Sequence, residues 1–466
     1  MKKAIYAMLS IILSFCILTY NSIMCFSVPE EAISTNEIAN WPIGPSVNAK
    51  AAFLMEANTG VILYAKNIHE HLYPASTTKI MTALLAARNS KMDEMVTFSY
   101  DAVFSLEPGS SNIGIDPGQA MPMNECLYGI MVGSANEVAN AVAEHVAGSI
   151  DAFVDMMNQT VNDLGLTDTH FTNTNGLHDE NHYTSAYDLA IIAREFFENE
   201  QLLKIGNTPR YHFEPTDTQP DDFYIKNKHK LINGEIPYPG IKGGKTGYTS
   251  QSNETLVTCA EQNGMKLICV VLYDDSPEQF NDTVKLFDYG FSNFEVSNIS
   301  ENESKYSIKS ADSFPSTVDI IGNSEPILEI NPDDYIIIPK NITFDDLTTE
   351  VDYETADKNK IANLKYSYHG AYLGTGSIDI IDKSKITSAF DASVTAKVSD
   401  IDEEKAPIIF INVMDIVGIM IVAGIFLITI SFIHSFLVNY NLLDNFRERR
   451  KNKKRRNRRD SGSLKF

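Results

Sequence analysis

The sequence predicts an α/β body that contains an antiparallel sheet, followed by a small all-β domain and a C-terminal transmembrane helix. Three observations support this prediction. Short apolar runs alternate with helix-length stretches over residues 48–294. Beyond Ser297 the apolar runs are shorter and rich in β-branched and aromatic residues. Residues 416–438 then contain no Asp, Glu, Lys or Arg, which is typical of a membrane span.

The composition indicates a large, acidic, folded protein. With 466 residues, of which 44% are apolar, the chain has material for two or more folded units. Lys and Arg number 38 and Asp and Glu 61, so the formal net charge is −23. Because a general nucleic-acid binder needs a basic face, this surplus of acids argues against a nucleic-acid partner.

The N-terminal end predicts export. Lys2 and Lys3 precede an uncharged run over residues 4–26, the layout of a secretory signal. We expect a signal peptide over residues 1–27, either cleaved after Ser27 or kept as an uncleaved anchor. Both outcomes place the body outside the cytoplasm.

The first folded region, residues 28–295, mixes strands and helices. Short apolar runs at 51–54 and 61–65 predict strands. Helix-like stretches follow at 78–87, 125–132, 138–147, 151–164 and 186–199. This alternation is typical of an α/β domain.

A β-hairpin and a helix are expected near the end of this region. Apolar runs at 254–260 and 265–273 flank Asn263-Gly264, a strong turn signal. A helix-like stretch at 278–290 follows. We therefore expect a helix packed on an antiparallel sheet.

The five cysteines do not form a scaffold. They include no Cys-x-x-Cys pair, which excludes a zinc ribbon, and they are too few for a disulfide framework. Across a two-residue turn Cys259 faces Ile268 rather than Cys269. We expect Cys259 and Cys269 to be buried free thiols, while a cross-strand disulfide stays conceivable.

Residues 296–400 predict a separate β-rich domain. The expected strands are the runs at 306–308, 317–321, 335–338, 371–381 and 393–398, which Asn, Asp, Gly and Pro separate. Residues 401–415 then form a charged linker.

The run at 416–438 predicts a membrane anchor. It has 23 residues. As a helix, which rises about 1.5 Å per residue, this run is long enough to cross the ~30 Å hydrocarbon core of a bilayer. In the tail, 439–466, ten Lys or Arg and one acid lie between Arg447 and Arg459. This cluster should stay cytoplasmic and attract anionic lipids, so we expect a single C-terminal span in the cell membrane with the body outside. A buried core helix followed by a nucleic-acid-binding tail is disfavoured, because both ends predict the same orientation.

Ser76 and Lys79 form the strongest chemical pattern. Pro74 suits a helix start, and in the first turn Lys79 lies on the same face as Ser76. A neutral Lys79 amine could take the hydroxyl proton, and burial among cations would lower its pKa. Ser76 is the only Ser with a Lys three residues later. Alone, the pattern would indicate an ordinary helix cap with a solvated Lys.

Two further patterns follow in the chain. Ser134 and Asn136 lie on a short stretch between two expected helices, where a hydroxyl and an amide could point into one cleft. Lys245-Thr246-Gly247 is the only Lys-Thr-Gly, and its cation and hydroxyl suit a carboxylate. Gly247 would let a substrate backbone approach closely. Separately, these patterns are also typical of ordinary loops and turns.

Together, the order of Ser-x-x-Lys, Ser-x-Asn and Lys-Thr-Gly resembles the low-molecular-mass penicillin-binding proteins, the serine-type D-alanyl-D-alanine carboxypeptidases. Segments that look like family sequence are Pro74-Ala75-Ser76-Thr77-Thr78-Lys79, Ser110-Ser111-Asn112-Ile113-Gly114, Ala141-Val142-Ala143-Glu144, Thr169-His170-Phe171, Asn175-Gly176-Leu177 and Lys245-Thr246-Gly247-Tyr248-Thr249. The resemblance covers residues 48–294, and more loosely the β-rich domain. It implies a helical lobe beside a five-stranded antiparallel sheet with helices, and an active site between them.

The resemblance also implies catalytic roles. Ser76 would be the acylated nucleophile, Lys79 its base, and Ser134 the relay of a proton to the leaving amine. The backbone N–H groups of Ser76 and Tyr248 would form the oxyanion hole. Peptidoglycan stem peptides and β-lactam antibiotics would be the partners, and neither cofactor nor metal is implied.

Substrate binding is implied for four further residues. Asn136 would hold the substrate's amide, Lys245 and Thr246 its terminal carboxylate, and Gly247 would leave room for its backbone. The chain departs from many relatives at Glu137, where they have Asp, and in its full membrane span, where some have an amphipathic anchor.

Four alternatives stay open. A β-lactamase shares the three motifs but needs an efficient deacylating carboxylate, and a D,D-endopeptidase of the same superfamily shares the chemistry. A zinc peptidase has its one local candidate at residues 178–182, which lacks the His-Glu-x-x-His pattern. A non-catalytic wall-binding or sensor protein would not need the complete set of nucleophilic residues.

Overall fold

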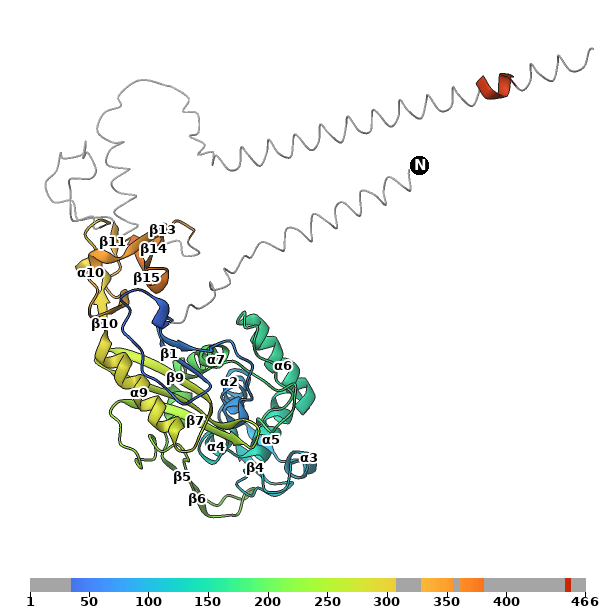
Figure 1. Ribbon diagram of the computed structural model, residues 1–466. Helices are drawn as coiled ribbons and strands as arrows, with labels where there is room; N and C mark the ends of the chain where they lie inside the picture. The colour runs from blue at the N-terminus through green and yellow to red at the C-terminus, as the bar shows by residue number, and fades with distance from the viewer. Residues whose placement is uncertain (1–34, 307–327, 355–359, 381–448, 454–466) are drawn as a thin grey trace, which may run out of the picture. The chain divides into compact units, whose positions relative to one another are not determined.

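The computed structural model of the protein describes residues 35–306, 328–354, 360–380 and 449–453 (Figure 1). The chain divides into two compact units, Met1–Thr387 and Ser388–Phe466. Of the second unit, only the short helical segment 449–453 is described.

Several expected segments lie outside the described residues. They are the signal peptide, the strands at 317–321 and 393–398, the linker, and the span at 416–438 with most of the basic tail. Within the described part, no helix is both long and apolar enough to cross a membrane. The C-terminal transmembrane helix of the expected fold therefore stays a prediction.

A five-stranded antiparallel sheet in the order β2-β1-β9-β8-β7 forms the centre of the first unit, as expected. Its strands are β1 (Ala51–Glu56), β2 (Ile62–Lys66), β7 (Ile241–Thr249), β8 (Asn253–Gln262) and β9 (Met265–Asp274). β8 and β9 form the expected hairpin, and both turn residues, Asn263 and Gly264, have positive φ. The strand β7, which carries the Lys-Thr-Gly triplet, lies at the edge of the sheet.

The sheet separates two apolar cores, because successive strand residues point to opposite faces. In β9, Ile268 and Val270 belong to the core beside the helices of the lobe, whereas Cys269 belongs to the core beside α9 (Glu278–Asn293). Cys259 is paired with Ile268, as the two-residue turn predicts, and belongs to the first core. The two cysteines are free and point to opposite faces, so they form no disulfide with each other.

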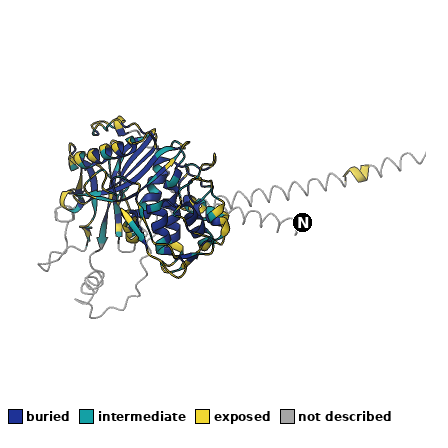
Figure 2. Ribbon diagram, turned by 90° about the horizontal axis from the view of Figure 1, so that it is seen from below, coloured by how far each residue is buried: buried dark blue, intermediate teal, exposed yellow. Residues whose placement is uncertain are grey.

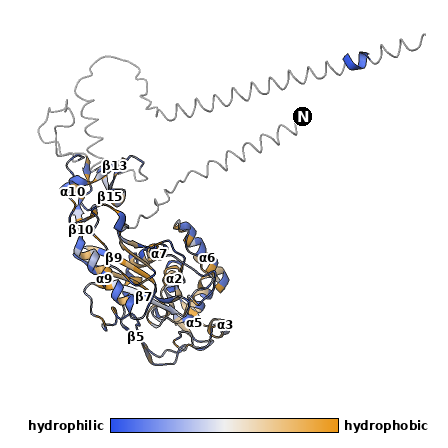
Figure 3. Ribbon diagram, in the orientation of Figure 1, coloured by the Kyte–Doolittle hydropathy of each residue, from blue (hydrophilic) through white to orange (hydrophobic). Residues whose placement is uncertain are grey.

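Helices cover both faces of the sheet (Figure 1). One face carries α9, and the other carries α7 (Ala186–Glu198) and α8 (Glu200–Gly206), with α2 (Lys79–Asn89) against α7. The lobe beyond them contains α3 (Tyr100–Phe104), α4 (Met123–Tyr128), the π-helical turn η3 (Gly129–Gly133), α5 (Asn136–Ala147) and α6 (Ile150–Asp163). Figures 2 and 3 show the consequence: the strands and inner helices are buried and apolar, and the outer helices turn polar faces to solvent.

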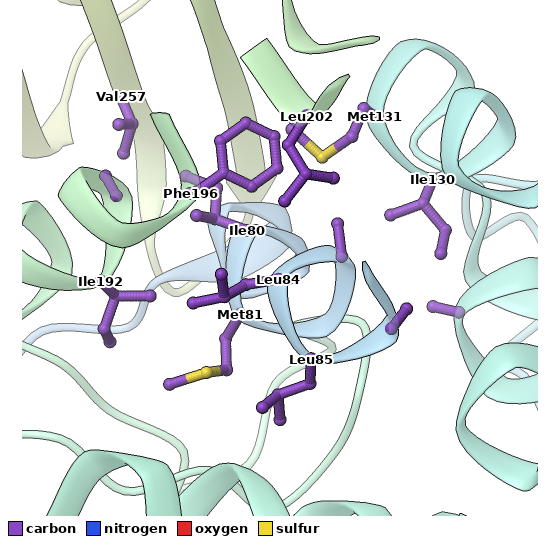
Figure 4. Packing of buried hydrophobic residues seen from close by; sticks show 14 of the residues in the cluster. Ile80, Met81, Leu84, Leu85, Ile130, Met131, Ile192, Phe196, Leu202 and Val257 are labelled. Carbon is purple, nitrogen blue, oxygen red and sulfur yellow. The ribbon is translucent and has the colours of Figure 1, made fainter. Parts of the chain in front are cut away.

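The helix α2 is buried over its residues 79–86. Figure 4 shows its side chains Ile80, Met81, Leu84 and Leu85 packed among Ile130, Met131, Ile192, Phe196, Leu202 and Val257, which come from η3, α7, α8 and β8. A helix enclosed in this way holds its N-terminal residues at a fixed place between the lobe and the sheet.

Two smaller sheets follow α9. β10 (Phe294–Asn298) pairs with β12 (Tyr335–Pro339), and a four-stranded sheet has the order β11-β15-β14-β13. The latter consists of β11 (Leu328–Ile330), β13 (Thr348–Asp352), β14 (Lys360–Tyr368) and β15 (Ala371–Ile380), with α10 (Ile299–Asn302) and η4 (Phe344–Asp346) beside the strands. Asn58 after β1 donates a hydrogen bond of 2.7 Å to the Tyr335 hydroxyl, which links these sheets to the body.

Short elements complete the first unit. They are η1 (Thr35–Glu37), the pair β3 (Met95–Thr97) and β4 (Ala120–Pro122), and the pair β5 (Arg210–Phe213) and β6 (Phe223–Lys226). Ile225 of β6 lies against Gly133, where an added Cβ would come within 3.3 Å of it. The β6 strand therefore lies beside the stretch that leads into Ser134.

Candidate active site

Ser76 lies in a tight turn that two other segments, β8 and the loop at Gly176, hold in place. The turn is η2 (Ala75–Thr78), and its first residue has a φ of 49°, which is uncommon for a residue other than glycine. Thr77 and, from β8, Thr255 both donate hydroxyl hydrogen bonds to the Pro74 carbonyl, at 2.7 and 2.9 Å. On the other side, an added Cβ at Gly176 would come within 1.8 Å of the Ala75 carbonyl oxygen.

Lys79 presents its amine directly to Ser76. The side chain is 0% exposed, and its Nζ lies 3.0 Å from Ser76 Oγ. The same nitrogen donates to Asn136 Oδ1 and to the Asn175 carbonyl, both at 2.6 Å. A neutral amine has two hydrogens, which these two oxygens take up, so its lone pair is directed at the Ser76 hydroxyl.

The surroundings of Lys79 favour the neutral amine. Burial lowers the pKa of Lys79 well below its usual value, and the charge of Lys245 lowers it further. The carboxyl of Glu137 acts in the opposite sense, and Lys228 adds a weaker lowering effect. The base that the sequence predicts thus has the environment that such a base needs.

Ser134 is presented by a break between two helices. It follows η3 in the left-handed conformation, with a φ of 58°, and the helix α5 begins two residues later at Asn136. Lys245 Nζ donates to Ser134 Oγ at 3.0 Å. The Asn136 N–H is bound by the Ser111 carbonyl at 2.9 Å, which ties this break to the preceding loop.

The strand β7 passes directly beside Ser76. Its Lys245 is buried, and burial together with the charge of Lys228 lowers the pKa of Lys245 to about 7. A Cβ at Gly247 would come within 2.8 Å of the Ser76 nitrogen and 2.4 Å of Thr255 Oγ1, so only glycine fits there. Thr246 is half-buried, while Tyr248 is 64% exposed.

The structure therefore brings together the residues that the three motifs contain. Ser76, Lys79 and Asn136 are joined by hydrogen bonds, Ser134 and Lys245 form a second group, and β7 connects the two at Gly247. The roles assigned to the individual residues stay predictions.

Glu137 and Lys228 belong to the surroundings of this site. Glu137 is 2% exposed, and its Oε1 accepts the N–H groups of Ile113 and Gly114 at 2.6 and 3.2 Å. Burial raises the pKa of Glu137. Lys228 is exposed and donates to Ser111 Oγ at 3.2 Å. The motifs did not point to Lys228, which the chain brings to the site from the segment after β6.

The zinc alternative finds no support in the described part of the chain. His178 is exposed whereas His182 is buried, and both ring nitrogens of His182 have protein partners. Among the described residues no group of three or more His, Cys, Asp or Glu side chains could hold a metal ion.

A buried lysine with a lowered pKa beside a serine hydroxyl is suited to acyl transfer, and the sheet and lobe around it have the fold of the penicillin-binding proteins and serine β-lactamases. Within that class, the chain belongs to the D-alanyl-D-alanine carboxypeptidase family (Peptidase_S11), whose pattern matches residues 37–276. The family expected from the three motifs is thereby confirmed.

Two curated relatives illustrate the similarity. The chain is 40% identical over 255 residues to the D-alanyl-D-alanine carboxypeptidase DacF of Bacillus subtilis, covering 53% of this chain and 63% of that protein. It is 31% identical over 348 residues to DacA of Haemophilus influenzae, covering 72% of this chain and 82% of that protein.

Solved structures agree with this assignment. Penicillin binding protein 5 from Haemophilus influenzae is similar with a TM-score of 0.57 and 28% identity, over 73% of this chain and 98% of that one. The Streptomyces K15 DD-transpeptidase is similar with a TM-score of 0.51 and 27% identity, over 54% of this chain and 99% of that one.

Proposed function

We propose that the protein is a serine D,D-carboxypeptidase that removes the terminal D-alanine from peptidoglycan stem pentapeptides through an acyl-enzyme on Ser76. One observation carries this proposal: Lys79 Nζ lies 3.0 Å from Ser76 Oγ, while two carbonyl oxygens occupy its hydrogens. The membership of the family supplies the substrate class.

In the first step, Ser76 Oγ attacks the carbonyl carbon of the penultimate D-alanine as its proton passes to the Lys79 lone pair. The resulting ammonium has three hydrogens, and Asn136 Oδ1, the Asn175 carbonyl and the serine oxygen can accept all three. The geometry thus accommodates Lys79 both before and after it takes the proton.

Collapse of the tetrahedral intermediate breaks the peptide bond. The leaving nitrogen needs a proton, and Ser134 can relay to it the proton that Lys79 took from Ser76, so that Ser134 keeps its hydroxyl and Lys79 becomes neutral again. Lys245 Nζ, 3.0 Å from Ser134 Oγ, can stabilise the charge that develops on this oxygen. The N–H groups of Ser76 and Tyr248 stabilise the oxyanion. Lys245 and Thr246 bind the terminal carboxylate, and Asn136 holds the substrate amide. Water then attacks the ester while the neutral Lys79 takes its proton, and Lys79 returns this proton to Ser76 Oγ as the ester bond breaks.

A β-lactam would acylate the same serine. Incubation with labelled penicillin, with and without EDTA, tests the proposal, because a covalent adduct that EDTA does not affect excludes both zinc hydrolysis and simple binding. Peptide mass mapping should place the adduct on Ser76, and Ser76→Ala should form none. An adduct elsewhere, or activity in Ser76→Ala, contradicts the assignment.

The product distinguishes the remaining alternatives. A carboxypeptidase releases free D-alanine from a stem pentapeptide, whereas an endopeptidase cleaves cross-linked dimers. Rapid turnover of penicillin would indicate a β-lactamase instead. A folded protein without any covalent adduct would indicate a wall-binding or sensor role.

We also propose that the enzyme is held at the cell membrane by residues 416–438, with the body outside. The support is the uncharged run followed by the basic cluster between Arg447 and Arg459, and the basic start of the N-terminal run. Anionic lipids would then be a partner of the tail.

A further inference from the structure

His182 is the buried member of an otherwise exposed stretch. Residues 178–181 are exposed, whereas His182 is 1% exposed. A polar ring that is enclosed in this way must find partners for its nitrogens, since an unpaired buried polar group costs free energy. Neither the nucleophile's chemistry nor substrate binding, as described above, uses this side chain.

The partners of His182 define its protonation state. Its Nδ1 accepts the Thr172 N–H at 3.0 Å, so the hydrogen of the neutral ring is on Nε2. Nε2 then donates to Thr78 Oγ1 at 2.8 Å. Burial lowers the pKa of His182 to about 3, which keeps the ring neutral over the range in which enzymes work.

These two partners belong to the two segments that bracket the Lys79 amine. Thr78 lies directly before Lys79, in the turn that contains Ser76. Thr172 begins the stretch that ends at Asn175, whose carbonyl accepts a hydrogen bond of 2.6 Å from Lys79 Nζ. The His182 ring therefore connects the segment that carries Lys79 to the segment that binds its amine.

Further bonds make the second segment stiff. Thr82 of α2 donates to the Thr174 carbonyl at 2.5 Å, and the Thr174 hydroxyl donates to Asn140 Oδ1 at 2.7 Å. The Asn173 side chain binds the N–H of Gly176 and the carbonyl of Leu177. Because the bond to Thr172 lies at the start of this stretch, a change there is transmitted along it toward Asn175.

We propose that His182 is a positioning residue for acylation, which holds Lys79 Nζ in place between Ser76 Oγ and the Asn175 carbonyl. This inference rests on the proposed function and adds a residue that its three motifs do not include. Displacement of a reacting group by about 1 Å can cost on the order of a hundredfold in rate. The two hydrogen bonds of the His182 ring, to Thr78 and to Thr172, can therefore affect the rate through the position of the Lys79 amine. We call these two bonds the His182 clamp.

Three substitutions at His182 distinguish the contribution of the bond to Thr78 from that of the bond to Thr172. His182→Leu removes both hydrogen bonds, His182→Gln retains a donor near the Nε2 position, and His182→Asn retains an acceptor near the Nδ1 position. The rate of acylation by labelled penicillin is measured across pH for each. We expect His182→Leu to acylate about tenfold to a hundredfold more slowly, and the Gln and Asn variants to recover part of that loss.

The pH profile supplies a readout that a merely structural role would not change. The acidic side of the profile reports the deprotonation of Lys79. A loosened site lets water reach the amine, which raises the pKa of Lys79 toward its ordinary value. The acidic side should therefore move to higher pH in His182→Leu, and its apparent affinity for penicillin should stay unchanged.

His170→Leu is the matched control, since His170 is exposed and binds the Asn181 carbonyl through Nδ1. Its profile should equal that of the wild type. Thr78→Val removes the other partner of the ring and serves as a second variant if His182→Leu does not fold. Thr78→Val removes only the Nε2 bond, so its shift should have the same direction and be no larger, and the double variant should be no slower than His182→Leu.

A wild-type profile in both His182→Leu and Thr78→Val, or additive effects in the double variant, would overturn the inference. Hydrogen exchange at the Thr172 amide gives a second reading that does not depend on activity: exchange should be slow in the wild type and fast in His182→Leu. If the wild type forms no penicillin adduct, the proposed function fails; if it acylates and the variants match it, only the role of His182 fails.

Discussion

At the scale of single residues, the three oxygens around Lys79 Nζ determine what the amine can do. Two of them, from Asn136 and Asn175, can only accept hydrogens, and the third is the serine hydroxyl. A cation that could not lose a proton would have no lone pair for Ser76. The charge of Lys79 is thus less important than its ability to become neutral.

Lys79→Arg should lose acylation although it keeps the positive charge. Guanidinium does not deprotonate in proteins, so the general base is absent, and we expect the acylation rate to fall by about 10²- to 10⁴-fold. Mass spectrometry of the penicillin adduct over time measures this loss. Lys91→Arg, at an exposed position, should acylate as the wild type does. Normal acylation by Lys79→Arg would transfer the role of base to another group.

Lys228→Met should change the pH dependence of acylation. The charge of Lys228 lowers the pKa of both Lys79 and Lys245. Without it, both pKa values rise, and the acidic side of the acylation profile moves to higher pH. The difference from the wild type should shrink at high salt, because Lys228 is exposed. Lys230→Met is the matched control, because Lys230 is not among the charges that shift the pKa of Lys79 or Lys245. An equal shift in both variants would contradict the prediction.

The sequence was sufficient for the motif residues but not for what surrounds them. Ser76, Lys79, Ser134 and Lys245 could be found because their side chains and spacing form a pattern. The Asn175 carbonyl could not, since a backbone oxygen has no signature in the sequence. Lys228 and His182 reach the site only through the path of the chain after β6 and after the Asn175 loop.

At the scale of elements, long periodic segments were predicted well. The helix expected at 186–199 is α7, the stretch at 151–164 is α6, and the hairpin closed by Asn263-Gly264 is β8 and β9. The stretch expected as one helix at 125–132 is instead α4 followed by a π-helical turn, which widens the backbone before Ser134. The spacing of apolar residues in this stretch does not reveal the change from an α-helix to a π-helical turn.

Short elements were missed for a different reason. The helix α8 and the strands β5 and β6 are four to seven residues long, too short for a period to emerge. The strand β10 pairs with β12 across a long interval of the chain. Such partners are determined by tertiary contacts, which local sequence does not specify.

Gly176→Ala should damage the site through the turn that holds Ser76. An added Cβ would lie 1.8 Å from the Ala75 carbonyl oxygen, and the φ of 87° disfavours a side chain as well. We expect a loss of about 4 kcal/mol or more in unfolding free energy, measured in urea, and a loss of acylation.

Gly148→Ala separates these two causes. Its φ is 83°, but no atom lies within 4 Å of the added Cβ. It should cost only about 1 kcal/mol, the strain of the backbone alone. Equal losses in the two variants would show that the contact with Ala75 has no effect of its own.

Asp274, at the end of β9, should make stability depend on pH. Burial and, more weakly, the neighbouring carboxyl of Asp282 raise the pKa of Asp274 from 3.8 to about 6, against the hydrogen bonds from Asn48 and Asp275. The folded protein therefore binds more protons than the unfolded chain in this window. Its contribution to stability is largest below about pH 4 and is lost as the pH rises to about 6.

Asp274→Asn should remove that part of the pH dependence. The melting temperature of the variant should exceed that of the wild type at pH 7, and the difference should disappear near pH 4. Thermal unfolding followed at several pH values measures it. Asp275→Asn, at an exposed neighbouring position, should leave the difference unchanged. If the melting temperature of Asp274→Asn changed with pH as that of the wild type does, the pH dependence would belong to other groups.

At the scale of the whole molecule, the charges of the chain predict its orientation in the cell. The span at 416–438 lacks formal charge, and reversing it would move the basic cluster across the bilayer. A truncated chain ending near Lys405 should be released as a soluble enzyme if the signal is cleaved, and should stay bound if residues 4–26 remain as an anchor. Membrane fractionation distinguishes these results.

Protease added to intact cells tests the same orientation. It should digest the body and spare a tag at Phe466. Loss of the tag while the membrane is intact would overturn the topology. Digestion of the body thus tests whether it lies outside, and survival of the tag tests whether the tail lies inside.

The placement of the cysteines has a consequence for how the enzyme matures. The three cysteines in the described part, Cys126, Cys259 and Cys269, are buried and free, and they lie in two cores that the sheet keeps apart. Burial raises the pKa of each thiol, which suppresses the reactive thiolate. The described part of the chain therefore contains no disulfide that a thiol oxidant or isomerase would have to form, and its active site rests on packing and hydrogen bonds.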